Sequence, residues 1–196
     1  MAGRIFKYLN AYSGSLSIME ESFEPKALPR AEEWDPPFCG EIDMRIAHDG
    51  TWFYNGTPIL RPALVRLFAS ILRKDPGGYV LVTPLEKVGI LVEDAPFTAV
   101  SMTVTKHGED QVLRFATNVS DTVEADAEHP LRFENDASGG VKPYIHVRRN
   151  LWALATRSLA LDVIELAKFK DHEGARQFGV LSHGLFFAID GADEDA

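Results

Sequence analysis

Closely spaced turn signals constrain the segment from Cys39 to Phe97 more than any other feature of this chain. Asp49-Gly50, Asn55-Gly56 and Gly77-Gly78 interrupt short runs rich in apolar and β-branched residues. Connections this short leave no room for the long helical crossovers that usually join parallel strands. The segment therefore predicts a β-rich, antiparallel arrangement with one short helix.

Charged residues stand on or beside the apolar runs of the same segment. Asp43, Arg45, Glu86 and Lys87 occupy such positions. A charge that leaves water needs a partner or a ligand to compensate for lost hydration. The pattern predicts a ligand cleft, but no reaction follows from it.

The composition bounds the size and the partners. The chain has 196 residues, of which 45% are apolar and 10% aromatic, enough for one large domain or two small ones. Its formal net charge of -9 argues against a nucleic-acid partner, because phosphate neutralisation needs a clustered excess of Lys and Arg. A small anionic ligand remains compatible, since a few local arginines can hold it.

Cysteine usage and hydropathy indicate the compartment. Cys39 is the single cysteine, so the chain has no internal disulfide and no thiolate metal cluster. No stretch approaches the roughly 20 apolar residues of a membrane span. We expect a soluble cytoplasmic protein with no membrane partner, no metal and no cofactor.

The chain divides into three predicted parts. Residues 1–36 form a peripheral leader that Pro36 and Pro37 close, residues 37–96 an N-terminal domain and residues 97–196 a C-terminal domain. In the N-terminal domain the strands are expected at 42–46, 52–54, 79–82 and 88–92, with a helix from Pro62 that carries its apolar stripe to Leu72.

The C-terminal domain is expected to contain more strands and a longer helix. Strands are predicted at 97–105, 112–117 and 144–147, and a final hairpin at 177–181 and 185–189. Asn150 is the expected N-cap of a helix that continues to about Lys168 and packs on a sheet.

The resulting fold class is α+β, with two β-rich halves and a helix packed on each sheet. Aligning Thr83 with Thr117 also pairs Pro96 with Pro130, and aligning Gly50 with Gly184 pairs two hairpins. These echoes suggest duplicated motifs.

Several motifs follow one another in a fixed order along the chain. They are W-x-P-P-x-C-G-x-I-D-M-R-I-A-x-D-G-T-W from Trp34, P-I-x-R from Pro58, Y-x-L-V-T-P-x-E-K-V from Tyr79, V-E-D-A-P-F from Val92, T-N-V from Thr117 and H-P-L from His129. Together these motifs resemble those of a bacterial family, domain of unknown function 1285. The resemblance implies a two-part fold with repeated motifs and a C-terminal half similar to a pleckstrin-homology barrel. It also implies a nucleotide-type ligand between the halves, with a role in signalling, and it brings no catalytic residues.

Two groups of residues in the N-terminal half are candidates for binding. Thr83 precedes the turn that carries Glu86 and Lys87. In the binding hypothesis Lys87 meets an anion, and Glu86 orders Lys87 or a ribose hydroxyl. The alternative is a hairpin loop with a solvated ion pair. Arg45 shares a strand face with Asp43 and is either a clamp for two oxygens or half of a salt bridge.

The C-terminal half contributes a second set of candidates. His129 and Arg132 are close in sequence, and Tyr144, His146 and Arg148 alternate along one strand and should share a face. They suit an anionic ligand, with Tyr144 stacking on it, or they form the polar outer face of a sheet.

The favoured hypothesis is a regulatory module that binds a small anionic, nucleotide-type ligand between the halves. One alternative is a hydrolase or transferase that uses His129 or His146 as general acid or base. The other is a scaffold whose exposed aromatic residues bind a protein partner. Its candidate residues are Trp52, Phe186 and Phe187.

Overall fold

The chain folds into two compact units in the computed structural model, which describes residues 31, 33–107, 110–136, 139–172 and 175–189. The N-terminal unit holds the described residues up to Arg45 together with Trp52–Leu91. The C-terminal unit holds Ile46–Thr51 and the described residues from Val92 onward. The predicted leader lies outside the described residues except for residues 31 and 33–36.

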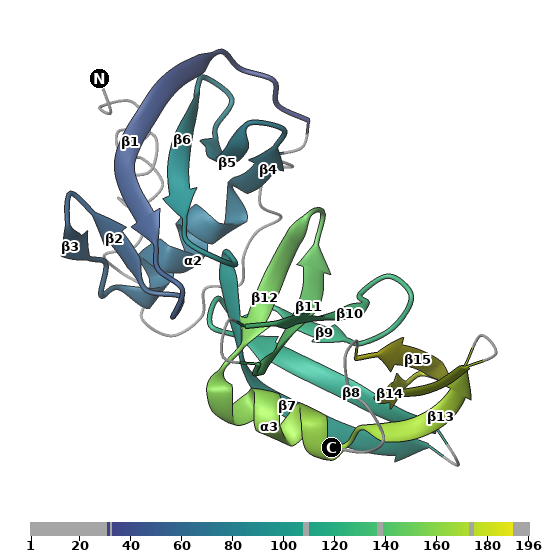
Figure 1. Ribbon diagram of the computed structural model, residues 1–196. Helices are drawn as coiled ribbons and strands as arrows, with labels where there is room; N and C mark the ends of the chain where they lie inside the picture. The colour runs from purple at the N-terminus through teal and green to yellow at the C-terminus, as the bar shows by residue number, and fades with distance from the viewer. Residues whose placement is uncertain (1–30, 32, 108–109, 137–138, 173–174, 190–196) are drawn as a thin grey trace. The chain divides into compact units, whose positions relative to one another are not determined.

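A six-stranded sheet forms the N-terminal unit, with the strand order β3-β2-β1-β6-β5-β4. Its elements are β1 (Phe38–Ile46), β2 (Trp52–Tyr54), β3 (Thr57–Pro58), α2 (Pro62–Ser70), β4 (Leu72–Asp75), β5 (Gly78–Val82) and β6 (Lys87–Val92). The neighbours β1 and β6 run in the same direction (Figure 1). The prediction of a purely antiparallel sheet is therefore wrong at this pair.

Local signals in the N-terminal unit act as predicted at the β2–β3 hairpin and at the start of α2. Asn55 and Gly56 both have positive φ, 47° and 72°, as a two-residue hairpin turn requires. Pro62 occupies the first helical turn, where its missing N–H costs nothing. Phe68 of α2 is fully buried and stacks on Trp52, with ring centroids 6.0 Å apart.

The predicted helix runs too far at its C-terminal end. Leu72 begins β4 and pairs with Leu81, and the Val82 N–H donates to the Ile71 carbonyl oxygen at 2.9 Å. The leucine is fully buried in either arrangement, so its hydrophobicity did not distinguish helix from strand.

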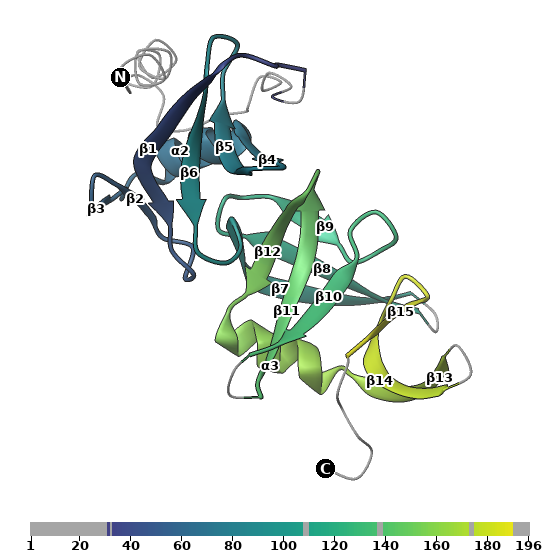
Figure 2. The same ribbon diagram turned by 45° about the horizontal axis from the view of Figure 1, so that its top comes forward.

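A second six-stranded sheet dominates the C-terminal unit, with the order β10-β11-β12-β7-β8-β9 (Figure 2). Its strands are β7 (Phe97–His107), β8 (Asp110–Thr117), β9 (Thr122–Glu124), β10 (Leu131–Asn135), β11 (Val141–Arg148) and β12 (Leu151–Ala155). Helix α3 (Arg157–Glu165) contacts β7, β11 and β12. A three-stranded sheet follows, formed by β13 (Lys168–His172), β14 (Ala175–Ser182) and β15 (Leu185–Ala188).

The long helix expected from Asn150 is wrong. Residues 151–155 form β12, which pairs antiparallel with β11 and parallel with β7. The helix starts only at Arg157, and the Leu159 N–H donates to the hydroxyl of the N-cap Thr156. Every residue of Leu151–Ala155 is apolar, so the run has no helical or strand period of its own and its two neighbouring strands decide its conformation.

The two six-stranded sheets repeat one topology. If the strands of each sheet are numbered from one to six in chain order, both sheets have the spatial order 3-2-1-6-5-4. For the second sheet this order is read from β9 to β10. The sequence echoes do not follow this repeat, because Thr83 comes after the fifth strand of its sheet whereas Thr117 ends the second strand of the other. The structure thus shows a strand-rich chain with two curled six-stranded sheets.

The last hairpin, β14–β15, is confirmed and is fixed to β8 by hydrogen bonds. The Leu113 N–H donates to the hydroxyl of the fully buried Ser182 at 3.1 Å. The Gln111 side chain donates to the Leu181 carbonyl oxygen at 2.6 Å. Neither helix of the described part of the chain has the length and apolar run needed to cross a bilayer.

Gly50, in the predicted Asp-Gly turn, packs tightly within the C-terminal unit. Its φ is +84°, and a Cβ at this position would lie 2.2 Å from Thr98 Oγ1 and 2.9 Å from Asn118 Nδ2. Asn118 accepts a hydrogen bond from the Thr98 N–H at 3.0 Å and donates to the Gly50 carbonyl oxygen at 3.4 Å. The glycine is required both for its backbone angle and for this close approach.

We predict that Gly50→Ala lowers the free energy of unfolding by about 3 kcal/mol, because it adds a collision to the backbone strain. Gly56→Ala is the matched control: its φ of +72° is similar, but no atom lies within 4 Å of the added Cβ. Gly56→Ala should lower the free energy of unfolding by about 1 kcal/mol. Urea denaturation of the two variants measures the difference, and equal losses would contradict the packing argument.

Candidate functional site

Thr83 and Glu86 close the turn between β5 and β6. The Thr83 hydroxyl donates to the Glu86 carbonyl oxygen at 3.0 Å and accepts from the Glu86 N–H at 3.2 Å. Both residues are buried, and no residue in the described ranges hydrogen-bonds to Glu86 Oε1. Thr83 therefore holds the turn.

Lys87 pairs with carboxylates other than Glu86. Its Nζ lies 3.2 Å from Asp75 Oδ2 and 3.5 Å from Asp35 Oδ1. Arg73 donates two hydrogen bonds to Asp75, at 2.6 and 3.0 Å. These bonds lower the pKa of Asp75; burial opposes the shift and Lys87 adds to it. The predicted ordering of Lys87 by Glu86 is not observed, because Asp75 has that role.

Lys87 also lines a groove of the N-terminal unit, with a volume of about 480 Å³. Its other lining residues come from β1, β5 and β6, from the end of β4 and from the turn that follows it: Phe38, Glu41, Asp75, Pro76, Gly77, Gly78, Tyr79, Val80, Gly89 and Ile90. A volume of this size falls in the range of small-molecule sites. The groove combines apolar walls with two carboxylates and one ammonium.

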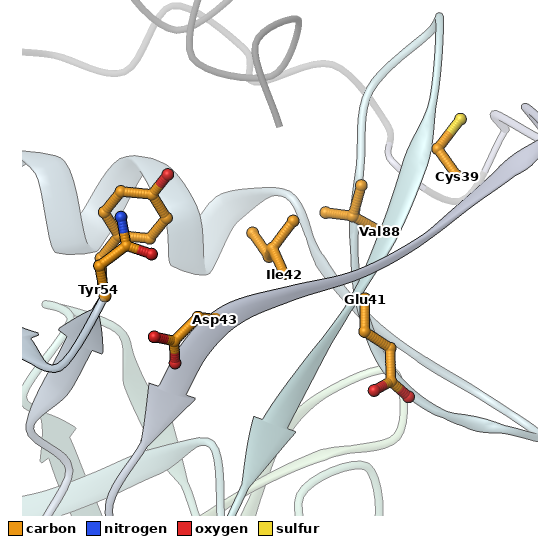
Figure 3. A pocket seen from close by; sticks show the side chains of 7 residues that line it. Cys39, Glu41, Ile42, Asp43, Tyr54 and Val88 are labelled. Carbon is orange, nitrogen blue, oxygen red and sulfur yellow. The ribbon is translucent and has the colours of Figure 1, made fainter. Parts of the chain in front are cut away.

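A smaller hollow, of about 250 Å³, lies along β1 in the same unit. Figure 3 shows Ile42 and Val88 pointing to one side of β1, with Glu41 pointing to the other side. Cys39, Asp43, Tyr54 and Asn55 complete the lining. Because Glu41 lines both spaces, it stands between the hollow and the groove.

Arg45 lies elsewhere on β1. Its guanidinium carbon is 4.3 Å from the centroid of the Phe53 ring, which is cation–π geometry. Met44 and Ile46, its neighbours along the strand, are buried, which confirms the predicted alternation. In the described residues, Arg45 does not line the groove or the hollow.

The C-terminal unit gathers four of the predicted residues on β10–β12 and the adjoining loop. Arg132 opposes Tyr144 in the β10–β11 ladder, and His146 opposes Trp152 in the β11–β12 ladder. The Arg132 guanidinium carbon lies 4.5 Å from the Tyr144 ring centroid and 4.6 Å from that of Trp152. We call Arg132, Tyr144, Trp152, His146 and His129 the aromatic face.

Two histidines extend the aromatic face. The His129 and His146 rings stack with centroids 5.7 Å apart, and His146 meets Trp152 edge-on at 5.2 Å. His129 Nδ1 lies 3.1 Å from the His146 carbonyl oxygen. The two ring nitrogens of His146 contact the carbonyl oxygens of Glu128 and Arg149. A general base at His146 would have to give up one of these contacts.

Asp94 contacts the aromatic face through Tyr144. It accepts a hydrogen bond from the Tyr144 hydroxyl at 2.8 Å and forms an ion pair with Lys142. Burial, aided by Asp94 and opposed by Lys142, raises the pKa of Tyr144 to about 12. Burial lowers the pKa of Lys142, but its bonds to Asp94 and Tyr144 outweigh this effect and raise it overall.

The structure corrects the role expected for Tyr144. Its exposed fraction is 2%, and Arg132 and Lys142 both lie over its ring. A ligand has no open surface of Tyr144 on which to stack. Trp152, by contrast, is only half-buried.

Arg148 does not belong to the aromatic face. The pairing of β11 with β12 shifts register between His146 and Arg148, so that Arg148 opposes Leu151 instead of a residue on the side of Trp152. It pairs with Asp121 and lies over the Phe97 ring at 4.7 Å, and burial lowers its pKa. The expected shared strand face of His146 and Arg148 is therefore wrong, because a β-bulge separates them.

Sequence reasoning missed Trp152 and Asp94 as parts of this face. Trp152 stood in the run interpreted as helix, and only its true strand pairing brings it opposite His146. Asp94 belongs to a quoted family motif, V-E-D-A-P-F, but its partners Lys142 and Tyr144 are about 50 residues away in sequence. No local signal connects them.

The scaffold hypothesis loses one of its residues. Trp52 has an exposed fraction of 1% and stacks on Phe68, so it is a core residue. Phe186 and Phe187 are half-buried on β15. In the described part of the chain, no three His, Cys, Asp or Glu side chains gather closely enough to hold a metal ion.

Comparison with family models covers both units. The model described as domain of unknown function (DUF1285), N-terminal domain, matches residues 29–95. The model described as protein of unknown function (DUF1285), C-terminal domain, matches residues 96–189. The chain belongs to the DUF1285 family. The resemblance found in the sequence motifs is thereby confirmed.

Two crystal structures of DUF1285 family proteins are similar to this chain. The protein from Silicibacter pomeroyi DSS-3 is 48% identical, with a TM-score of 0.77 over 84% of this chain and 88% of that one. The protein from Shewanella baltica OS155 is 26% identical, with a TM-score of 0.50 over 63% of this chain and 91% of that one. No curated protein matches the chain.

We predict that Asp75→Asn lowers the free energy of unfolding by about 2 kcal/mol at pH 7, because Arg73 and Lys87 lose their charged partner. The folded state lowers the pKa of Asp75, so this stabilisation is present above the unfolded value near 4 and disappears as the pH falls through the folded value. Urea denaturation should show a difference in the free energy of unfolding between wild type and Asp75→Asn at pH 7, and this difference should become smaller at pH 3.

The control for this experiment is Asp162→Asn, which alters an exposed carboxylate of α3. Asp162→Asn should leave the free energy of unfolding at pH 7 nearly unchanged. A gap between wild type and Asp75→Asn that has the same size at both pH values would show that the ion pairs do not stabilise the unit.

Proposed function

We propose that this DUF1285 protein is a regulatory module that binds a small anionic ligand with a planar aromatic group, of the nucleotide type, on the aromatic face. One observation carries the proposal: the Arg132 guanidinium stacks over Tyr144 and Trp152 while 47% of its side chain stays exposed. A stacked guanidinium keeps its N–H edges available for two oxygens of a phosphate or carboxylate.

The partner that Arg132 already has is easily replaced. Its Nη1 lies 2.9 Å from Glu134 Oε1, and both side chains are 47% exposed. Exposed ion pairs of this kind contribute at most about 1 kcal/mol. An anionic ligand can therefore take the place of Glu134, while its ring lies against Trp152.

Two other cations of the unit, Lys142 and Arg148, do not bind the ligand in this proposal. Lys142 is neutralised by Asp94, and Arg148 pairs with Asp121 on the other side of the sheet. In this proposal Arg132 is the single guanidinium that meets the anion, and the Tyr144 ring beneath it orients the guanidinium plane.

Binding without turnover is the favoured reading. Both ring nitrogens of His146 face main-chain carbonyl oxygens, which occupies the positions that a general base at this residue would use. The contact of His129 Nδ1 with the His146 carbonyl oxygen orients the His129 ring. The likeness of this half to a pleckstrin-homology barrel, the signalling role and the cytoplasmic location remain predictions that accompany this proposal.

Calorimetric titration of the full chain with AMP, GMP, CMP and UMP tests the proposed function. We expect at least one of them to bind more tightly than its nucleoside and than inorganic phosphate. Arg132→Ala should weaken that binding at least about tenfold, since it removes the charge-assisted hydrogen bonds. Arg132→Lys should recover only part of it, because an ammonium does not offer a planar fork.

Arg61→Ala is the matched control, because Arg61 is exposed in the N-terminal unit and lies outside the aromatic face. It should bind the nucleotide as the wild type does. The proposed function fails if none of the four nucleotides binds, or if Arg132→Ala binds with unchanged affinity.

A further inference from the structure

The groove of the N-terminal unit has a floor without a side chain. Gly89 on β6 pairs with Val80 on β5, and a Cβ at Gly89 would lie 3.0 Å from Glu41 Cγ and 3.5 Å from the Phe38 ring. Any larger residue at this position would reach the side chains that border the groove. The glycine therefore lets the Glu41 and Phe38 side chains pack close to the backbone of β6 beside the groove.

Opposite charges border the groove. Glu41 reaches over Gly89 from β1, and within the described residues nothing donates a hydrogen bond to its carboxylate. Lys87 comes two residues before Gly89 on β6, which places it on the same strand face about 6.6 Å away. The groove thus has both a carboxylate and an ammonium in its lining.

Lys87 retains a donor for a ligand. An ammonium group has three N–H bonds, and those of Lys87 have two acceptors, Asp75 at 3.2 Å and Asp35 at 3.5 Å. The third can point into the groove. Since Asp75 is also held by Arg73, the position of the Lys87 ammonium is fixed before a ligand arrives.

The rest of the lining is largely apolar. The Phe38 side chain is 55% exposed, an unusual position for a phenylalanine, and Ile90 and Val80 form buried parts of the wall. A ligand that covers Phe38 would remove apolar surface from water, which favours binding. The groove thus offers an apolar surface beside its charged pair.

We propose that this groove binds a free α-amino acid with an apolar side chain. The ligand's ammonium group meets Glu41, its carboxylate meets Lys87, and its side chain lies on Phe38. The ammonium and carboxylate groups of an α-amino acid are joined through one carbon, so one such ligand offers a charged partner to each of the two groove residues. This site is independent of the aromatic face, which belongs to the other unit.

Calorimetric titration of the full chain with L-leucine and L-phenylalanine tests the proposal. Both should bind more tightly than glycine, which lacks the apolar group. N-acetyl-L-leucine lacks the positive charge and L-leucinamide lacks the negative one, so each should bind at least about tenfold more weakly than L-leucine.

Two variants assign the binding to the groove. Glu41→Gln should weaken the binding of L-leucine at least about tenfold, so that the variant no longer binds L-leucine more tightly than N-acetyl-L-leucine. Gly89→Ala should weaken the binding of L-leucine by displacing the Glu41 and Phe38 side chains, and the variant should still fold, because the atoms near the new Cβ belong to side chains that can move. Glu165→Gln, the same change at an exposed position of α3, should bind as the wild type does.

The outcomes separate this site from the aromatic face. Arg132→Ala should leave L-leucine binding unchanged, so failure at one site does not imply failure at the other. The proposal is overturned if neither amino acid binds, if N-acetyl-L-leucine or L-leucinamide binds as tightly as L-leucine, or if Glu41→Gln and Gly89→Ala both bind like the wild type.

Discussion

Pairing between the first and the last strand of each six-stranded sheet organises both units. β1 and β6 run in the same direction, as do β7 and β12, and the four strands between each pair bring the chain back to the required end (Figure 1). A parallel pair normally depends on a helical crossover, and here a set of antiparallel strands supplies the return. The groove forms where β1 meets β6 and β5, and the aromatic face forms on the three strands that end with β12.

Neutralisation of charge by the protein itself decides which cations can act on a ligand. Asp75 holds Arg73 and Lys87, Asp94 holds Lys142, and Asp121 holds Arg148. Partly buried charges need such partners to offset lost hydration. Two of the cations predicted as anion ligands, Lys87 and Arg148, therefore have carboxylate partners within the protein. The two proposals use one stacked guanidinium, Arg132, and the third donor of Lys87. The two units therefore offer different chemistry, an exposed cation on aromatic rings in one and an opposite-charge pair over a glycine in the other.

Prediction from the sequence succeeded where a conformation is fixed by neighbouring residues. Asn55-Gly56 needs positive φ at both positions, and Pro62 suits only the first turn of a helix, so both features followed from residue type. It failed at Leu72 and at Leu151–Ala155, where the residues are apolar whichever element they join. For the candidate site, His129, Arg132, Tyr144 and His146 were selected and are brought together. Trp152 was missed, and Arg148 was misplaced because a β-bulge cannot be read from an alternating pattern.

The sequence by itself determined the family, the richness in strands, the positions of most turns and the residue types available for binding an anion. Those properties depend on composition and on contacts between residues close in the chain. Only the tertiary structure decided which charges are paired, because the partners of Asp94 and of Lys87 come from distant segments. It also decided that Glu41 and Phe38 of β1 lie over Gly89 of β6 beside the groove, because these residues are far apart in the sequence and only the strand pairing brings them together.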